Sequence, residues 1–212
     1  MARQVTGAAR RVADAAEVLR DEKFNARRIE LAEAALETLG ELGFARTSLR
    51  EIAQNSAFTH GVFHYYFSDK LDLICCCVRH YKAQCVTRYD EVTAASKTRD
   101  ELMEGFLGKL AATLREDARM HRLWYDLRAQ ALFEQAFRHD VVEIDRNLEA
   151  MIWRIAYRFA ELGGKKPAIS SAALYALFDG LFQSALLKQS SNDDAAIPDL
   201  LAEVRRLLPM IC

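Results

Sequence analysis

Helix-breaking residues are scarce in this sequence. Only 3 of its 212 residues are proline and 9 are glycine, while 51% are hydrophobic. Such a composition is typical of a globular, mostly helical protein. No alternation of polar and apolar residues, internal repeat or low-complexity tract points to another architecture. The predicted fold class is therefore all-α.

A surplus of charge of one sign is also missing. The formal net charge is −1, and residues 1–70 hold ten Lys or Arg against ten Asp or Glu, a net of zero. Non-specific affinity for nucleic acid grows with the number of phosphates that a protein neutralises. Any binding to nucleic acid must therefore depend on the local arrangement of side chains.

The chain also lacks a long apolar run and a recognisable cysteine pattern. Its longest apolar run, Leu73 to Val78, is far shorter than the roughly 20 residues that cross a bilayer. Residues 1–24 are charged throughout, unlike a secretory signal. Cys75, Cys76 and Cys77 are consecutive, which suits neither a zinc knuckle nor a disulfide framework. We expect a soluble cytoplasmic protein with no metal, cofactor or membrane partner. The sequence does not decide whether any of the cysteine thiols is redox-active.

Helical patterns cover most of the sequence. The first, residues 25–42, places Ile29, Ala32, Leu36 and Leu39 on one apolar face and ends at Gly43, a suitable C-terminal glycine. Further helices are predicted over residues 69–91, 98–116, 117–137, 139–162 and 169–189, and over a last segment that begins near residue 198 and ends at 208.

Two short helix patterns separated by a polar turn lie between the first two long helices. Ser48 followed by Glu51 predicts a capping box, so the first short helix should begin at Ser48. Residues 55–57, Asn-Ser-Ala, suit a turn. Thr59 is the expected N-cap of the second short helix. This spacing is typical of a helix-turn-helix.

The second short helix has an unusual outer surface. Phe58 and Phe63 should anchor this helix to its neighbours. Its open side then carries His60, Gly61, Val62, His64 and Tyr65. Glycine costs about 1 kcal/mol inside a helix, so Gly61 suggests that another backbone, here a DNA strand, comes close. A metal site at His60 and His64 is the alternative, but no carboxylate or cysteine lies at a matching local spacing.

At these residues the chain resembles the TetR family of bacterial transcriptional regulators. The resemblance runs from about Arg27 to Leu73 and includes Gly43-Phe44, Thr47-Ser48, Ile52-Ala53, Thr59, Gly61, Tyr66-Phe67 and Lys70. Three positions depart from the family pattern. Ala57 stands where the family usually has a turn glycine, Val62 where threonine is commoner, and His64 where tyrosine is commoner. The last two bear on which bases are read.

The resemblance implies a DNA-binding site with two kinds of contact. Base edges would be read by His60, Val62 and His64. Phosphates would be held by Thr47, Ser48, Arg50, Thr59, Tyr65, Tyr66 and Lys70. The implied domains are an extension over residues 1–24, a helix-turn-helix domain over 25–71, and a helical effector-binding and dimerisation domain over 72–212. In the extension and just after it, Arg10, Arg11, Arg20, Arg27 and Arg28 either wrap a DNA groove or belong to a solvated helix or frayed tail.

The segment 169–189 is apolar nearly all round, so it must be buried on more than one side. The resemblance implies a two-fold homodimer through the last two helices, which sets two recognition helices against palindromic double-stranded operator DNA. The expected interface residues are Leu174, Phe178, Leu181, Phe182, Leu200, Val204 and Leu208. A monomer core built from the same residues is the alternative.

The middle helices should hold a small-molecule effector. Its expected contacts are Tyr81, Phe106, Trp124, Tyr125, Arg128, Trp153 and Tyr157, with Arg128 as an anion anchor. The segments 123–126 and 128–132 resemble a subgroup that includes regulators of choline–glycine betaine metabolism, and an aromatic box suits a quaternary ammonium. For each aromatic residue, core packing is the alternative.

The expected function is a ligand-responsive transcriptional regulator, most often a repressor in this family. The alternative is a helical small-molecule-binding protein or an enzyme without DNA function. The sequence contains no Gly-rich phosphate loop, no His-Glu-x-x-His and no Gly-x-Ser-x-Gly.

Overall fold

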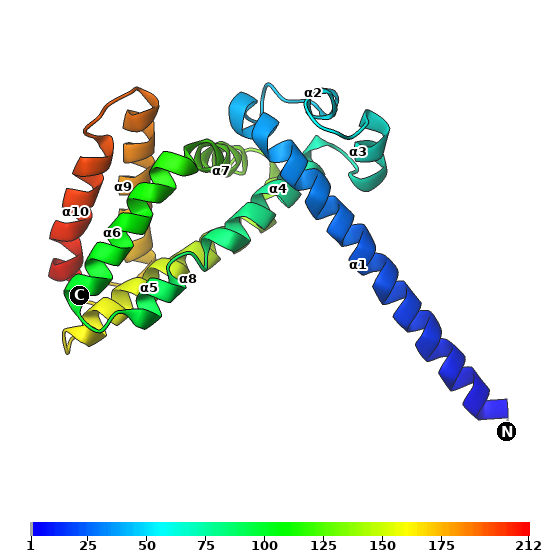
Figure 1. The fold of residues 1–212 in the computed structure, drawn as a ribbon, viewed down its shortest axis with the longest axis horizontal. Coiled ribbons are helices and arrows are strands. Elements are labelled where there is room, and N and C mark those ends of the chain that lie inside the picture. The colour runs from blue at the N-terminus through cyan, green and yellow to red at the C-terminus, as the bar shows by residue number, and fades with distance from the viewer. Residues whose placement is uncertain (1) are drawn as a thin grey trace. The chain divides into compact units, whose positions relative to one another are not determined.

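The computed structural model describes the backbone of residues 2–212 and the side chains of residues 17–212 (Figure 1). Its helices are α1 (Ala2–Leu42), α2 (Leu49–Gln54), α3 (His60–Tyr66), α4 (Lys70–Cys85), α5 (Asp90–Ala95), α6 (Arg99–Glu116), α7 (Ala118–Gln130), the short 3₁₀ helix η1 (Gln135–Phe137), α8 (Arg138–Leu162), α9 (Ser171–Ser190) and α10 (Ala196–Ile211). The part of the chain that the structure describes contains no strand, so the predicted all-α class is confirmed. None of its helices is long and apolar enough to cross a membrane.

Two compact units make up the fold, Met1–His80 and Tyr81–Cys212. The first contains α1, α2, α3 and the start of α4, and the second contains the end of α4 and all later helices. The helix α4 therefore belongs to both units. The domain boundary that the family resemblance implies, between residues 71 and 72, stays a prediction.

The first unit is held by α1, which begins at Ala2 rather than at Asn25. Residues 8–22 contain neither glycine nor proline and are rich in alanine, so nothing stops a helix there. The helix ends as predicted, since Gly43 has φ +74° and donates its N–H to the Leu39 carbonyl at 2.9 Å. Of the arginines discussed above, Arg10 and Arg11 lie outside the residues whose side chains are described.

The apolar face of α1 is rotated from the predicted one. Its fully buried residues are Leu31, Ala32, Ala35 and Leu39, whereas Ile29 is 39% exposed. The prediction of Ile29 as a core residue is therefore wrong. The pattern 31-35-39 and the pattern 29-32-36 both have helical spacing, and only the position of the neighbouring helices decides between them.

The second unit is a helical bundle. Helix α9 packs against α8 and α10, and α10 packs against α6 (Figure 1). Helix α6 starts one residue after its predicted start, because the Thr98 side chain caps it by accepting a hydrogen bond from the Glu101 N–H at 3.2 Å. Helix α9 likewise starts after Ser170, whose hydroxyl caps the Ala173 N–H.

Two of the predicted helices are broken. The predicted helix 69–91 stops at Cys85 and resumes as α5 at Asp90. Side chains from later helices hold the break, since Arg154 donates to the Val86 carbonyl at 2.6 Å and Lys109 to the Arg88 carbonyl at 3.0 Å. Because these partners come from distant parts of the chain, local sequence does not reveal the break.

The predicted helix 117–137 is also interrupted. Helix α7 ends at Gln130, a turn follows, and η1 covers Gln135–Phe137. Arg138 donates to the carbonyl of Ala131 at 3.1 Å and to that of Leu132 at 3.4 Å, which satisfies groups that the helix leaves unpaired.

Candidate functional site

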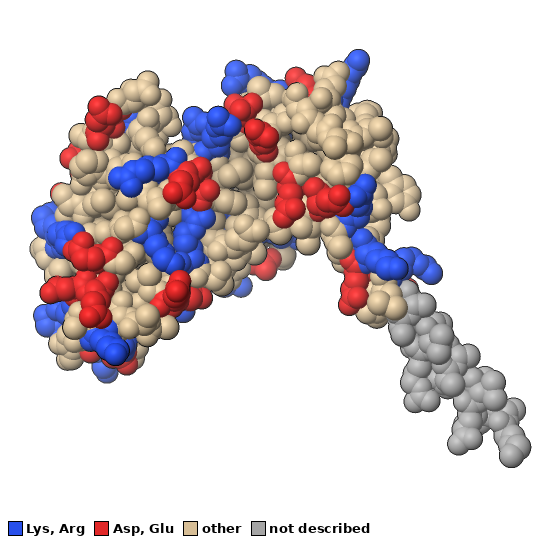
Figure 2. Space-filling view, in the orientation of Figure 1, with Lys and Arg blue, Asp and Glu red and all other residues tan. Residues whose placement is uncertain are grey.

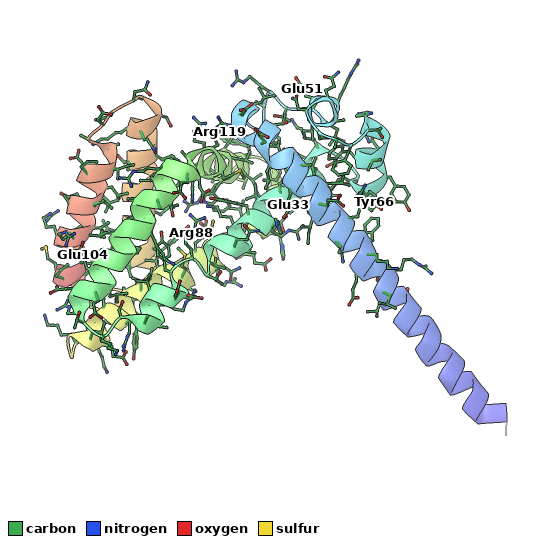
Figure 3. The ribbon with its side chains drawn as sticks, in the orientation of Figure 1. Glu33, Glu51, Tyr66, Arg88, Glu104 and Arg119 are labelled. Atoms are coloured by element: carbon green, nitrogen blue, oxygen red, sulfur yellow. The ribbon has the colours of Figure 1, made fainter. Side chains whose placement is uncertain are left out.

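The helix-turn-helix begins with the predicted capping box. The Ser48 hydroxyl accepts from the Glu51 N–H at 3.2 Å, and the Glu51 carboxylate accepts from the Ser48 N–H at 2.7 Å (Figure 3). Leu49 and Ile52 bury the inner side of α2. After the turn, Thr59 occupies the N-cap position of α3 as predicted, although its side chain makes no capping hydrogen bond.

Helix α3 is anchored on one side and open on the other. Phe63 and Phe67 are buried, at 0% and 1% exposure. On the open side lie His60, Gly61, His64 and Tyr65, which are exposed, and Val62, which is half-buried. The two histidine Nε2 atoms are 3.1 Å apart. The helix therefore presents polar and aromatic side chains outward while its phenylalanines fix its position.

Gly61 stands on this open side without crowding. A Cβ atom at this position would meet only the Thr59 Oγ1, at 4.0 Å. No side chain or backbone of the described fold requires a glycine there. Any need for the missing side chain must come from a partner that approaches from outside.

The predicted phosphate contacts are placed unequally. Ser48, Arg50 and Thr59 are exposed. Thr47 is only 3% exposed and its hydroxyl donates to the Gly43 carbonyl at 2.7 Å. Lys70 is half-buried, where its ammonium donates to the Phe44 carbonyl at 2.9 Å and lies 4.2 Å from the centre of the Phe44 ring. These two side chains already hold parts of the fold together.

The two tyrosines of α3 meet an aromatic residue that the sequence interpretation missed. Phe24 of α1 lies with its ring centre 4.9 Å from that of Tyr66, the residue labelled in Figure 3, and 6.5 Å from that of Tyr65. The family resemblance puts residue 24 in the extension, because the first helix is expected to begin one residue later. A continuous helical pattern through residue 24 is the signal that could have found it.

Arg28 has a structural role instead of a role in a basic arm. Its guanidinium donates to the Tyr66 carbonyl at 3.2 Å, pairs with Asp72 and lies 4.6 Å from the centre of the Phe67 ring. Burial is the largest single effect and lowers the pKa of Arg28, but the hydrogen bond to Asp72, the charge of Asp72 and the nearby Cys76 together leave the pKa raised. Arg28 thus connects α1 to the end of α3 and the start of α4. Its neighbour Arg27 lies over the ring of Phe58.

Charge on the surface is mixed. Figure 2 shows basic and acidic side chains interspersed over the visible face of the described residues, with no continuous basic patch. This agrees with the zero net charge of residues 1–70 counted above. Any binding of DNA by this unit must therefore depend on the local arrangement of side chains more than on accumulated charge.

The second unit contains a cavity of about 80 Å³. One water molecule needs roughly 10–15 Å³ by the same measure, so a small organic molecule or several waters can enter. Its lining residues are Lys82, Cys85, Arg88, Tyr89, Phe106, Leu110, Thr113, His121, Trp124, Tyr125, Leu148, Met151, Ile152, Tyr175, Phe178, Asp179, Phe182, Leu200 and Val204.

The cavity includes only part of the predicted effector site. Phe106, Trp124 and Tyr125 line it. The other four residues of that prediction, Tyr81, Arg128, Trp153 and Tyr157, are not among its lining. Tyr157 is 52% exposed, on the outside of α8. Helical spacing puts these aromatics near one another, but it does not distinguish the inner from the outer side of α8.

Arg128 lies behind the cavity wall in a charged network. Its guanidinium pairs with Asp179 and, at 3.2 Å, with Asp145. Tyr125 donates to Asp179 at 2.9 Å and Tyr175 donates to Asp145 at 2.6 Å. Burial, followed by the nearby Asp179, raises the pKa of both tyrosine hydroxyls. Arg128 is therefore already paired with two carboxylates from the chain itself.

The least expected pair in the wall is Lys82 and His121. Lys82 is 2% exposed and His121 is 8% exposed, and the lysine Nζ lies 3.3 Å from the histidine Nδ1. Burial lowers the pKa of Lys82 to about 8. Burial, reinforced by the positive charge of Lys82, holds the pKa of His121 well below its usual value. Lys82 shares one face of α4 with the apolar residues Val78 and Cys85. This spacing indicates a buried lysine, and the sequence interpretation overlooked it.

The residues expected at a dimer interface lie mostly inside the chain. Leu174, Phe178, Leu200, Val204 and Leu208 are buried within the single subunit, and Leu181 and Phe182 are half-buried. Four of the seven, Phe178, Phe182, Leu200 and Val204, line the cavity. When a helix is apolar on all sides, its sequence does not show which side packs inside its own subunit.

The outer side of α9 carries other apolar residues. Leu177 is 36% exposed and Leu187 is 70% exposed. No atom lies within 4 Å of the position that a Cβ on Gly180 would take. Together with Ala173 and Ala176, which are also exposed, these residues form what we call the outer face of α9.

Comparisons with known proteins agree with this arrangement. The model of bacterial regulatory proteins of the tetR family matches residues 31–74. No curated protein sequence matches the chain significantly. The structure resembles a TetR transcription regulator from Haloarcula marismortui, with 16% identity, a TM-score of 0.71, and coverage of 88% of this chain and 98% of that one.

Two further structures have the same fold. One is the transcriptional regulator FadR from Bacillus subtilis in complex with stearoyl-CoA, with 18% identity, a TM-score of 0.66, and coverage of 84% of this chain and 95% of that one. The other is the reduced form of E. coli NemR, with 17% identity, a TM-score of 0.68, and coverage of 84% and 96%. The family match covers the helix-turn-helix itself, so residues 31–74 are similar to bacterial regulatory proteins of the tetR family, and the structure as a whole has the fold of such regulators.

Proposed function

We propose that this protein is a ligand-responsive repressor that binds a palindromic operator as a homodimer. The observation that carries the proposal is the open side of α3, where exposed His60, His64 and Tyr65 surround an uncrowded Gly61. A helix anchored by buried phenylalanines and open on a polar side can enter a major groove and read base edges.

Within this proposal, the contacts fall into two groups. His60, Val62 and His64 read bases. Phosphates are held by Ser48, Arg50, Thr59, Tyr65 and Tyr66, with Lys70 and Thr47 bracing the ends of the motif because they bond to Phe44 and Gly43. The exposed N-terminus of α2 at Ser48 adds backbone N–H groups that suit a phosphate.

The proposed dimer forms through the outer face of α9 together with α10. Exposed Leu187 and Met210, at 70% and 68%, are large apolar side chains that a second subunit would cover. A two-fold dimer of this kind places two α3 helices on successive major grooves, about 34 Å apart.

The cavity of the second unit is the proposed effector site. Lys82, Cys85 and Arg88 bring α4 and the turn after it to the cavity wall, and α4 begins only four residues after the end of α3. FadR, which has this fold, is known in complex with stearoyl-CoA. An effector that prefers one position of α4 would change the separation of the two recognition helices and release the DNA.

The test is a mobility shift at defined salt concentration, with DNA from upstream of the protein's own gene and its divergent neighbour. We expect a specific shift and a protected palindrome. The double variant His60→Ala/His64→Ala should lose specific binding, whereas His139→Ala, which changes an exposed histidine of α8, should keep it. Equal binding by all three proteins would contradict the proposed reading of the operator by α3.

A further inference from the structure

The cavity wall contains hydrogen-bond donors that lack acceptors. Among the described residues, the buried Nε2 of His121 and the buried Nε1 of Trp124 have no hydrogen-bond partner. Both residues line the cavity, at 8% and 1% exposure. Buried polar atoms in folded proteins are almost always paired, so two unpaired atoms in one wall suggest that a ligand completes them.

The bond between Lys82 and His121 fixes which atom of the histidine is a donor. A lysine ammonium has only donors, so the His121 Nδ1 at 3.3 Å must accept. The ring proton of the neutral histidine then lies on Nε2, the atom without a partner. His121 is held in this position by the ring of Phe182, whose centre is 4.7 Å away. The free atom of His121 is therefore an N–H donor.

Lys82 supplies the positive charge of the wall. Within residues 17–212, its ammonium forms no ion pair, and its contacts are His121 and the rings of Tyr81 and Trp124, at 5.6 and 5.1 Å. One of its three protons reaches His121, so two remain available. An ammonium so deeply buried needs a negative partner, because burial without one is costly.

The other charged groups of the lining are already compensated. Arg88 donates to the Thr113 hydroxyl at 2.6 Å and to the Asp117 carboxylate at 2.5 Å. Asp179 accepts from Tyr125 and pairs with Arg128. Each of these two charged lining residues therefore has a partner of opposite charge. Among the described lining residues, Lys82 is the charged one without a direct ion pair, although Asp179 and Asp145 act on it from a distance.

We propose that the effector is a monocarboxylate with an apolar body. Its carboxylate accepts hydrogen bonds from the two free protons of Lys82, and its body packs against Phe106, Leu110 and Met151. A buried ammonium without a direct ion pair suits one carboxylate, and its two free protons match the two carboxylate oxygens. The inference depends on the proposed function only in taking this cavity as the effector site.

A carboxylate effector differs from the quaternary ammonium that the sequence suggested. A quaternary ammonium would lie beside the Lys82 ammonium, and like charges at short range in a buried site repel strongly. The aromatic residues of the cavity still contribute, but as the apolar wall for the body of the ligand. The anion anchor is Lys82, and Arg128, which was expected in that role, is occupied by two aspartates.

The test uses three sets of probes with matched carbon skeletons. They are hexanoate, decanoate and phenylacetate; the alcohols hexanol, decanol and phenylethanol; and hexyl- and decyltrimethylammonium. The chain has two tryptophans, so Trp153→Phe leaves Trp124 as the only reporter in the cavity wall. Binding is titrated by Trp124 fluorescence in this background, without DNA.

We expect at least one carboxylate to bind saturably and at least about tenfold more tightly than its alcohol, with no binding of the ammonium compounds. Lys82→Met should remove the preference for carboxylate over alcohol and leave the affinity for the alcohol unchanged. Lys165→Met, which removes an exposed lysine after α8, should behave as the parent. A merely structural Lys82 would change affinity for all probes alike.

Three outcomes would overturn the proposal. They are no carboxylate binding at millimolar concentration, equal or tighter binding of an alcohol or ammonium probe, and an unchanged carboxylate preference in Lys82→Met. Operator binding is measured separately on the same proteins. Specific DNA binding without carboxylate binding refutes this inference alone, and carboxylate binding without DNA binding refutes the proposed function alone.

Discussion

Replacing Lys82 by methionine should make the ligand-free protein more stable, and the gain should shrink as the pH rises. Methionine is similar in length to lysine and carries no charge, so it fits the cavity wall without a buried ammonium. The side chain is 2% exposed, so solvent does not screen its charge appreciably.

The size of the effect follows from the pKa of Lys82, which burial lowers from 10.5 to about 8. The other charged or titratable groups that act on it are Cys85 and Arg88 near the end of α4, His121 on α7, Asp145 on α8 and Asp179 on α9. A lowering of this size corresponds to about 3 kcal/mol of destabilisation when the native protein holds the proton.

The sign of the pH dependence is fixed by proton uptake. Between pH 8 and 10.5 the unfolded chain keeps the Lys82 proton and the native protein releases it, so the stability of the parent protein rises with pH. The free energy of unfolding of Lys82→Met should exceed that of the parent by about 3 kcal/mol at pH 7 from this source. By pH 9.5 the difference should fall by about 2 kcal/mol. Any gain from the apolar methionine is independent of pH.

Urea unfolding at pH 7 and pH 9.5, followed by tryptophan fluorescence, measures this difference. Both tryptophans, Trp124 and Trp153, belong to the second unit, so the signal reports on the unit that contains Lys82. Lys165→Met is the control and should follow the parent at both pH values. A difference that stays constant between the two pH values would refute a buried, protonated Lys82.

Three further substitutions test other parts of the molecule. Gly61→Ala should stabilise the first unit by about 0.5–1 kcal/mol in thermal unfolding, since a Cβ meets no close atom there. The same change should weaken operator binding at least about tenfold in a mobility shift. Arg28→Met should destabilise the same unit by about 2 kcal/mol in urea unfolding followed by circular dichroism, because it leaves the half-buried Asp72 and the Tyr66 carbonyl without their partner. Leu187→Arg should convert the dimer to a monomer in sedimentation velocity, because it places a charge at an exposed position of the outer face of α9.

Each substitution has an outcome that contradicts its reasoning. Full operator affinity in Gly61→Ala would mean that no DNA strand comes close to α3 at this point. Unchanged stability in Arg28→Met would show that α1 is held by its apolar face alone. Leu187→Arg is compared with Val142→Arg, which changes an apolar residue of α8 that is 57% exposed. Equal effects of the two would exclude α9 as the specific interface.

Features set by neighbouring residues are predictable from the sequence. The capping box of Ser48 and Glu51, the glycine that ends α1 and the cap at Thr98 all depend on residues three or four positions apart. The fold class follows from the same local patterns. For this reason the amino-acid sequence alone is enough to locate the helix-turn-helix.

Features that depend on distant residues are not predictable in this way. The end of α4 is fixed by Arg154 and Lys109, which lie 68 and 21 residues from the carbonyls they bind. The buried state of Lys82 depends on His121, 39 residues away. The inner side of α9 is chosen by α8 and α10. Helical periodicity gives the faces of a helix, but only packing decides which face is inside.

The break between α4 and α5 has a consequence for how the protein exchanges its amide hydrogens. The carbonyls of Val86 and Arg88 are held by Arg154 and Lys109, and Arg154 also binds Asp90 at 2.8 Å. A turn fixed from two other helices cannot open by itself, so the turn between α4 and α5 should open only when its contacts with α6 and α8 are lost. We therefore expect the amide hydrogens of this turn to exchange as slowly as those of the bundle core, and much more slowly than those of an ordinary helix end.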